Sequence, residues 1–173
     1  MILKTKRLLI RPFEKNDNND LYEIYSDTKV CKYLLHDAWN EDNKVKEFQQ
    51  KLKYNKLKRG GKINLACVLD KKVIGDISIC YTGMKETVEI GFTFNRAYFG
   101  KGYAYESVRA VVEYLFKNYE IHRILANLDS RNLSSAKLCE RIGMRKEAHF
   151  IKDYWNKGEW TDSYIYGMLI SDL

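Results

Sequence analysis

The sequence contains a single proline, Pro12, and lacks Ser- or Pro-rich linkers, internal repeats and low-complexity tracts, so nothing in it marks a domain boundary. No apolar run approaches the roughly 18 residues that are needed to cross a bilayer. The opening stretch MILKTKRLLIRPF carries charges every few positions and lacks the apolar segment of a secretory signal peptide. We therefore expect one domain over residues 1–173, a cytoplasmic location and no membrane partner.

Metal-binding and disulfide patterns are also missing. The four cysteines are widely scattered without a Cys-x-x-Cys pair, and the three histidines are equally dispersed. This spacing favours buried, reduced thiols at Cys31, Cys67, Cys80 and Cys139. We expect neither a zinc site nor any other metal.

Charge is the most unbalanced feature of the composition. Thirty lysines and arginines against 23 acidic residues give a formal net charge of +7. Such a charge favours anionic partners, among them nucleic acid, a membrane surface or a phosphorylated cofactor. The densest basic stretch, residues 51–62, is more typical of an exposed helix face followed by a loop than of a nucleic-acid site. We therefore expect no specific nucleic-acid partner.

Periodicity in the first third of the chain predicts one strand and two helices. The segment RLLIRPF predicts a strand that ends near Pro12. A helix is predicted from Asn18, and a second, lysine-rich helix is predicted to stop at Gly60–Gly61. The residues at helical spacing are Leu21, Ile24, Tyr25 and Thr28 in the first helix and Val45, Phe48 and Leu52 in the second.

The pattern then changes to strands. Residues 63–69 and 73–80 are separated by a short Asp-Lys-Lys segment, which predicts an antiparallel hairpin. Residues 88–94, VEIGFTF, alternate strictly between two faces of a third strand. One face carries Val88, Ile90, Phe92 and Phe94, and the other carries Glu89, Gly91 and Thr93.

The second half of the chain predicts a crossover and a final hairpin. An amphipathic helix follows residue 103, with its apolar face at Ala104, Val108, Val111, Val112, Leu115 and Phe116. A strand at 123–128 after that helix implies a right-handed parallel β-α-β crossover. Asn132 is suited to cap a short helix that Gly143 ends, and strands near 145–154 and 160–169 follow. The predicted class is α+β, with a mixed, mostly antiparallel sheet.

The loop FGKGYAYES, residues 99–107, joins the third strand to the long helix. Its glycines either form a tight turn or let successive backbone amides hold an anion at the helix N-terminus. Two phosphate-binding motifs are excluded. A Walker loop requires glycine where Asn95 stands and Ser or Thr where Gly102 stands, and a dinucleotide fingerprint requires Gly or Ala in place of Tyr105.

Three stretches in order resemble the GNAT acetyltransferases, especially the ribosomal-protein N-terminal and spermidine acetyltransferase branch. They are EIGFTFNRAYFGKGYAYES, ANLDSRNLSSAKLCERIGM and KDYWNKGEWTDSYIYGML, and the likeness extends from the KTKRLLIRPF segment to Leu169. The resemblance implies helices on both faces of the sheet and a monomer or homodimer. It also implies acetyl-CoA as cosubstrate and acetyl transfer to a primary amine, either a protein N-terminus, such as that of a ribosomal protein, or a small amine.

The resemblance also implies a set of cofactor-binding residues. The family pattern Gln/Arg-x-x-Gly-x-Gly/Ala, whose amides hold the coenzyme A pyrophosphate, is matched by Phe99, Gly100, Lys101, Gly102, Tyr103 and Ala104. Phe99 stands where the family usually has Gln or Arg. This difference weakens any role for the side chain at position 99, but it leaves the backbone amides of the loop unchanged. Phe92, Thr93 and Phe94 match the strand that pairs with pantetheine, and Asn132 matches the asparagine that contacts the cofactor.

Amine acetylation needs a base, because a lysine-like amine with a pKa of about 10.4 is almost fully protonated at neutral pH. Glu89 matches a glutamate of the spermidine-type enzymes and is the candidate; the alternative is a structural carboxylate. Cys139 occupies the position of the family's acid tyrosine, so it is either a thiol acid or a core residue, and direct release of thiolate is the third option. Asn127 replaces a glutamate base of some relatives.

Two aromatic residues near the last hairpin, Tyr154 and Trp155, either line the acceptor site or belong to the core. The sequence is also compatible with two other functional classes. A non-catalytic acetyl-CoA sensor would keep the cofactor site without turnover. A basic nucleic-acid-binding protein would rest on charge alone.

Overall fold

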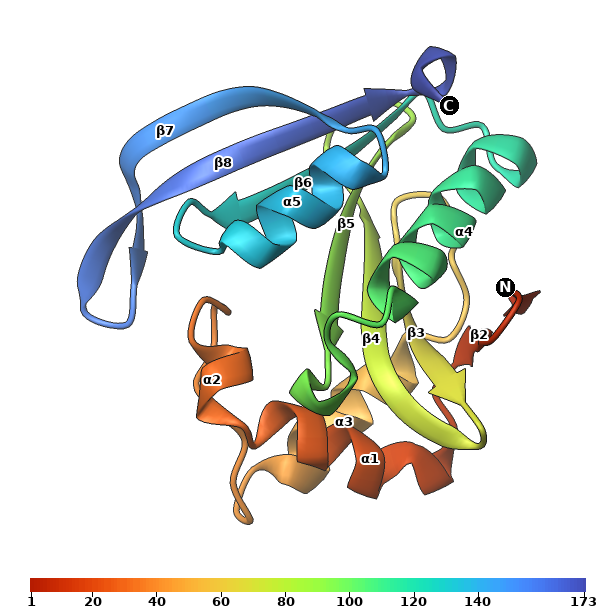
Figure 1. The fold of residues 1–173 in the computed structure, drawn as a ribbon, viewed down its shortest axis with the longest axis vertical. Helices are drawn as coiled ribbons and strands as arrows, with labels where there is room; N and C mark the ends of the chain where they lie inside the picture. Colours follow the sequence, from red (N-terminus) through yellow and green to blue (C-terminus); the bar gives the residue numbers. More distant parts are fainter.

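The computed structural model describes residues 1–173, which form one mixed sheet of eight strands in the order β1-β2-β3-β4-β5-β6-β8-β7 (Figure 1). Only β5 and β6 pair in parallel, and every other neighbouring pair is antiparallel. The predicted α+β class is confirmed. The strands are β1 (Leu3–Lys4), β2 (Leu9–Pro12), β3 (Lys62–Leu69), β4 (Lys72–Tyr81), β5 (Thr87–Phe94), β6 (Arg123–Asp129), β7 (Arg145–Asn156) and β8 (Glu159–Leu169).

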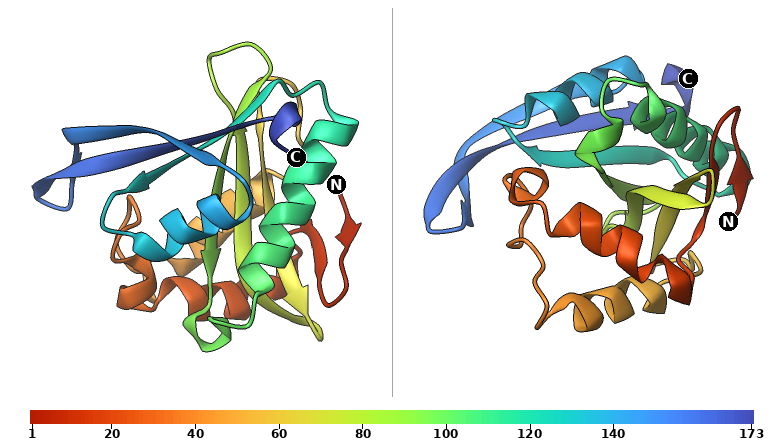
Figure 2. Two further views of the ribbon diagram at one scale, coloured as in Figure 1. Left: turned by 45° about the horizontal axis from the view of Figure 1, so that its top comes forward. Right: turned by 60° about the horizontal axis from the view of Figure 1, so that its bottom comes forward.

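Helices cover both faces of this sheet, as Figure 2 shows. One face carries α4 and α5, whose apolar residues join the larger core cluster. The other face carries α1, α2 and α3 over a smaller cluster. The helices are α1 (Asn18–Tyr25), α2 (Thr28–Cys31), α3 (Lys44–Lys53), α4 (Tyr103–Asn118) and α5 (Leu133–Arg141).

Alternation along the central strands decides which side chains meet which helices. Leu65 and Cys67 of β3 belong to the core under α4, whereas Ala66 and Val68 belong to the core under α1 and α3. Because successive strand residues point to opposite faces, both faces of β3 are buried. The alternation predicted for β5 is confirmed, since Val88 and its alternate neighbours join the α4 core. Glu89 therefore lies on the face that carries α1–α3.

Two helix boundaries differ from the prediction. Thr28 begins the separate helix α2, because the chain leaves α1 at Ser26 and the Asp27 side chain accepts the amide of Lys29 to start a new turn. Helix α3 ends at Lys53 rather than at Gly60–Gly61. There the Tyr54 carbonyl accepts the amide of Asn64 on β3, which draws the chain out of the helix.

The last two strands form a long hairpin that projects from the body of the molecule in Figure 1. The final strand β8 lies between β6 and β7, so β7 is the edge of the sheet. The hairpin continues two residues beyond the predicted end of its first strand, to Asn156. None of the helices combines the length with the apolar composition that a membrane-spanning helix requires.

Candidate active site

The two parallel strands separate shortly after they meet. Their pairing is confined to Thr87–Glu89 of β5 and Arg123–Leu125 of β6. Beyond that point β5 continues to Phe94 against β4 and β6 continues to Asp129 against β8, but neither has a strand partner on the side that faces the other. A strand edge without a partner presents free N–H and C=O groups. The gap between β5 and β6 therefore offers backbone hydrogen bonds to a ligand.

A cleft of about 330 Å³ occupies this gap. Its walls come from β4, β5, β6, the start of α5, the segment after α2 and the β7–β8 hairpin. Among the residues singled out from the sequence, those that line it are Glu89, Phe92, Thr93, Asn127, Asn132 and Tyr154. The structure thus brings together residues that lie far apart in the chain, from Glu89 on β5 to Tyr154 on β7.

Glu89 has no partner within the protein. Its carboxylate makes no hydrogen bond or ion pair, whereas the other two carboxylates that line the cleft, Asp76 and Asp129, are both paired with cations. The side chain is accessible from the cleft, but surrounding protein atoms displace bulk water, and this desolvation raises the pKa of Glu89 above its ordinary value. An unpartnered carboxylate with a raised pKa is suited to accept a proton.

A buried polar network connects α1, α3 and β4 at one side of the cleft. Lys51 forms an ion pair with Asp76, and the Tyr25 hydroxyl donates to the same carboxylate at 2.6 Å. Burial opposes the charge of Lys51, but Asp76 and Tyr25 outweigh it and raise the pKa of Lys51. The same burial raises the pKa of Tyr25, so its phenol stays protonated. No local pattern in the sequence indicates this network, because its members are separated by at least 25 residues.

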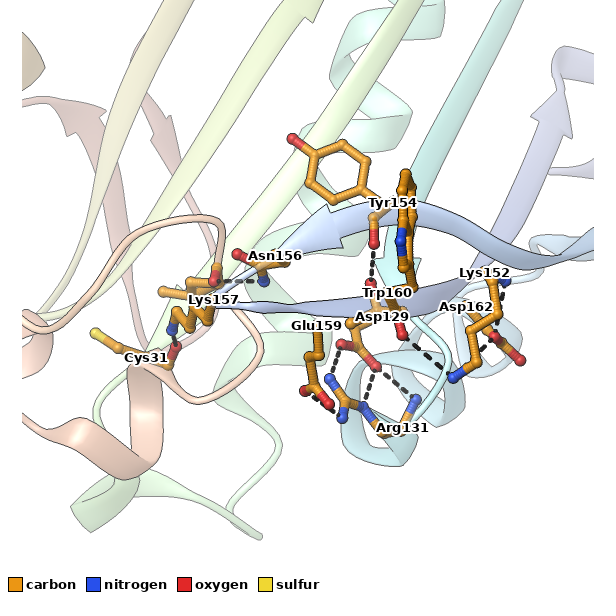
Figure 3. Close-up of polar contacts among 12 residues, drawn as sticks. Cys31, Asp129, Arg131, Lys152, Tyr154, Asn156, Lys157, Glu159, Trp160 and Asp162 are labelled. Atoms are coloured by element: carbon orange, nitrogen blue, oxygen red, sulfur yellow. Dashed lines mark hydrogen bonds and ion pairs between the residues drawn. The ribbon is translucent and has the colours of Figure 1, made fainter.

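The tip of the β7–β8 hairpin is bonded to the last residue of α2 and to the segment that follows α2 (Figure 3). Lys157 donates to the Cys31 carbonyl at 2.6 Å, and Asn156 donates to the Leu34 carbonyl at 3.3 Å. Tyr154 lines the cleft close to this bridge. Trp155 does not line the cleft; the residue is 57% exposed, and its ring packs against the ring of Trp160. Neither aromatic belongs to the core.

The turn between β6 and α5 is fixed by ion pairs that Figure 3 also shows. The Arg131 guanidinium bonds both carboxylate oxygens of Asp129, at 2.9 and 2.7 Å, and reaches Glu159 of β8 at 2.8 Å. Asn132 follows, and its side-chain oxygen accepts the amide of Ser135 as the cap of α5. Asn132 is therefore both a helix cap, as predicted, and a residue of the cleft wall.

The glycine loop lies beyond the end of β5 and does not line the cleft itself. Gly100 and Gly102 have φ values of 76° and 81°, a region that side chains disfavour. Helix α4 begins its hydrogen bonding only where the Glu106 amide reaches the Gly102 carbonyl, and no amide from Gly100 to Tyr105 has an acceptor in the protein. Phe99 is 53% exposed and adds no charge. The loop therefore fits an anion held by backbone amides.

Of the four thiols predicted to be buried, Cys80 is exposed on β4, and the other three are buried. Two candidates for the site also lie outside the cleft. Cys139 has no exposed surface and belongs to the α4–α5 core, where burial raises the pKa of its thiol to about 12. Because this thiol is shielded from the cleft, it cannot act as the general acid for the leaving thiolate. Cys139 is therefore a core residue, which was the second of the two alternatives. The side chain of Phe94 is also buried and does not line the cleft, so only its backbone is available at the free edge of β5. No cluster of three or more His, Cys, Asp or Glu side chains is arranged to hold a metal ion.

A sequence model described as the acetyltransferase (GNAT) domain matches residues 7–145. The chain belongs to the GNAT family. It is 38% identical over 169 residues to the uncharacterized N-acetyltransferase YnaD of Bacillus subtilis (strain 168), covering 98% of this chain and 97% of that protein. It is also 30% identical over 106 residues to the ribosomal protein uS5-alanine N-acetyltransferase of Escherichia coli (strain K12), covering 60% and 54% of the two chains.

The fold comparison agrees. The crystal structure of an acetyltransferase (GNAT family) from Bacillus anthracis superposes with a TM-score of 0.87 at 34% identity, covering 98% of each chain. The resemblance predicted from the sequence is confirmed. This GNAT protein is an N-acetyltransferase. Its acyl donor is acetyl-CoA, the cosubstrate of the family, which carries the acetyl group as a thioester.

Proposed function

We propose that this GNAT enzyme, a single domain over residues 1–173, acetylates the α-amino group of a peptide or protein N-terminus with Glu89 as general base. The observation that carries the proposal is the isolation of Glu89. It is the one carboxylate of the cleft without a cationic partner, and it stands where β5 and β6 part. Glu89 accepts the proton that the attacking amine must lose.

The acceptor follows from charge. A polyamine carries several ammonium groups, which need several free carboxylates, and the cleft offers one. The net charge of +7 also repels polycations. A peptide α-amine has a pKa near 7.7–8.0, so a far larger fraction is neutral at pH 7 than of a lysine-like amine. The similarity to a ribosomal protein N-acetyltransferase supports this class of acceptor.

The same geometry supports roles for the cofactor residues. We assign the free edge of β5, at Phe92, Thr93 and Phe94, to backbone pairing with the pantetheine arm and to donation toward the oxyanion. Amides of the glycine loop, at Gly100, Lys101, Gly102, Tyr103 and Ala104, face the diphosphate. Asn132, in the cleft wall, contacts the arm. Because Cys139 is buried outside the cleft, it cannot protonate the leaving thiolate, and the thiolate leaves directly.

A thiol-release assay with acetyl-CoA tests the acceptor. We expect peptides with free N-termini to be acetylated with a kcat/KM at least tenfold above that of spermidine or an aminoglycoside, and N-formylated copies of the peptides to be inert. A higher kcat/KM for spermidine would overturn the proposal. Binding of coenzyme A without turnover of any amine would do so as well.

A further inference from the structure

Arg7, in the segment between β1 and β2, lies against the glycine loop that follows it by more than 90 residues. Its Nη1 donates to the Lys101 carbonyl at 2.9 Å, and its Nε pairs with Glu106 of α4 at 2.6 Å. The guanidinium also lies 4.3 Å from the centre of the Tyr103 ring. Its remaining nitrogen, Nη2, stands 3.4 Å from the position that a Cβ at Gly102 would take. One side chain thus contacts both the loop and the first turn of the helix.

The contact with Glu106 bears on anion binding. Glu106 lies in the first turn of α4, beside the loop amides that have no acceptor. Thr5 donates to its carboxylate at 2.6 Å and the Arg7 amide at 2.8 Å. Burial opposes the charge of Glu106, but these bonds and Arg7 outweigh it and lower the pKa of the carboxyl group. A fixed negative charge at this helix end repels a diphosphate unless a cation neutralises it.

The contact with Lys101 bears on the direction of the loop amides. Because a trans peptide unit points its C=O and its N–H to opposite sides, a carbonyl held by Arg7 turns the Gly102 amide away from Arg7. A carbonyl that swung into the anion's place would repel it. The bond to Arg7 therefore keeps the amide on the side of the ligand.

We propose that Arg7 is a positioning residue for the diphosphate of coenzyme A, which it favours by neutralising Glu106 and by fixing the Lys101–Gly102 peptide. This inference rests on the proposed assignment of the glycine loop to the cofactor. It places a determinant of cofactor affinity in the N-terminal segment, outside the glycine motif.

Titration calorimetry with coenzyme A tests the proposal without any acceptor. We expect Arg7→Ala to weaken binding about tenfold. Arg7→Ala combined with Glu106→Gln should regain the part of that loss that comes from the repelling charge, but not the part that comes from the bond to Lys101. Binding by the Arg7→Ala variant that equals the parent's overturns the inference. If the double variant binds coenzyme A no more tightly than Arg7→Ala does, the claim that Arg7 acts by neutralising Glu106 is wrong. A parent that binds no coenzyme A contradicts the proposed function instead.

Two controls separate positioning from general stability. Arg11 makes the same kind of contacts, to Asp17 at 2.7 Å and to the Pro12 carbonyl at 3.0 Å, but on the α1 side of the sheet. Arg11→Ala should lower the unfolding temperature and leave coenzyme A affinity unchanged. In the acetylation assay, Arg7→Ala should raise KM for acetyl-CoA with kcat unchanged and leave KM for S-acetylpantetheine, which lacks the diphosphate, as in the parent. An equal rise in KM for acetyl-CoA and for S-acetylpantetheine in the Arg7→Ala variant would contradict the proposal.

Discussion

Glu89 and Leu125 are the last residues that β5 and β6 hold in parallel register, and residues that follow them on both strands line the cleft. The carboxylate therefore stands at the apex of the divergence, next to backbone groups that have no partner. The divergence of β5 from β6 thus places a proton acceptor, Glu89, beside backbone amides that are free to donate hydrogen bonds.

Replacing Glu89 by Gln should lower kcat by about 10²–10⁴-fold, roughly 3–5 kcal/mol of barrier, and leave coenzyme A affinity almost unchanged. The loss should shrink as pH rises, because more of the amine is then neutral without a base. In the parent, kcat/KM should fall as pH drops through the raised pKa of Glu89, since the protonated carboxyl group accepts no proton.

The matched control is Glu86→Gln, because Glu86 pairs with Arg59 and Lys85 outside the cleft and should not affect the rate. Desolvation disfavours the charge on Glu89, so Glu89→Gln should also unfold no more easily than the parent. A Glu89→Gln variant with the parent's rate at pH 7 would show that Glu89 is only a strand residue.

Replacing Gly102 by Val should weaken coenzyme A binding at least tenfold. Its φ of 81° strains a β-branched residue, and the new side chain would also crowd Arg7. Gly158 at the β7–β8 turn has the same φ, and a Cβ there meets nothing within 4 Å. Calorimetry should show that Gly158→Val binds as the parent does. Equal affinities for Gly102→Val and the parent would remove the loop from the cofactor site.

Replacing Lys51 by Met should lower the free energy of unfolding by about 3–5 kcal/mol, because the ion pair is lost while the Asp76 carboxylate stays buried at 2% exposure. Lys51→Met combined with Asp76→Asn should recover much of that loss, since no unpaired charge is left. Denaturant unfolding monitored by tryptophan fluorescence measures the free energy of unfolding of both variants. A double variant as unstable as Lys51→Met would contradict this account of the network.

Stability should decrease in acid. Arg123 lowers the pKa of Glu147, and bonds to Arg131 outweigh burial to lower the pKa of Asp129. A carboxyl group whose pKa is lower in the folded protein binds protons more tightly once unfolded, so its contribution is present above about pH 4.3 and is lost as pH falls through the folded pKa. Denaturant unfolding at pH 7, 4 and 3 should show that the free energy of unfolding decreases as the pH is lowered. The decrease should be smaller in the Glu147→Gln variant, which lacks one of these carboxyl groups. A flat profile would contradict the prediction.

Local sequence patterns were sufficient for the elements that carry the site. The alternation of VEIGFTF predicted β5 and the face that carries Glu89, and the apolar spacing after Gly102 predicted α4. The order of strand, helix and strand predicted the parallel pair. These features follow from periodicity and backbone preference, which depend on neighbouring residues. The predicted end of α3 at Gly60–Gly61 was wrong because the helix ends at Lys53, where the Asn64 amide of β3 donates to the Tyr54 carbonyl and draws the chain away.

The isolation of Glu89, the burial of Cys139 and the contact of Arg7 with Glu106 were decided only by the tertiary structure. Each depends on residues brought together from distant parts of the chain, where burial and charge neighbours are set by packing rather than by sequence spacing. The sequence by itself determined which side chains the cleft could use. The sheet order and the divergence of β5 from β6 decided which of them face it, because solvent access and hydrogen-bond partners exist only in the folded molecule.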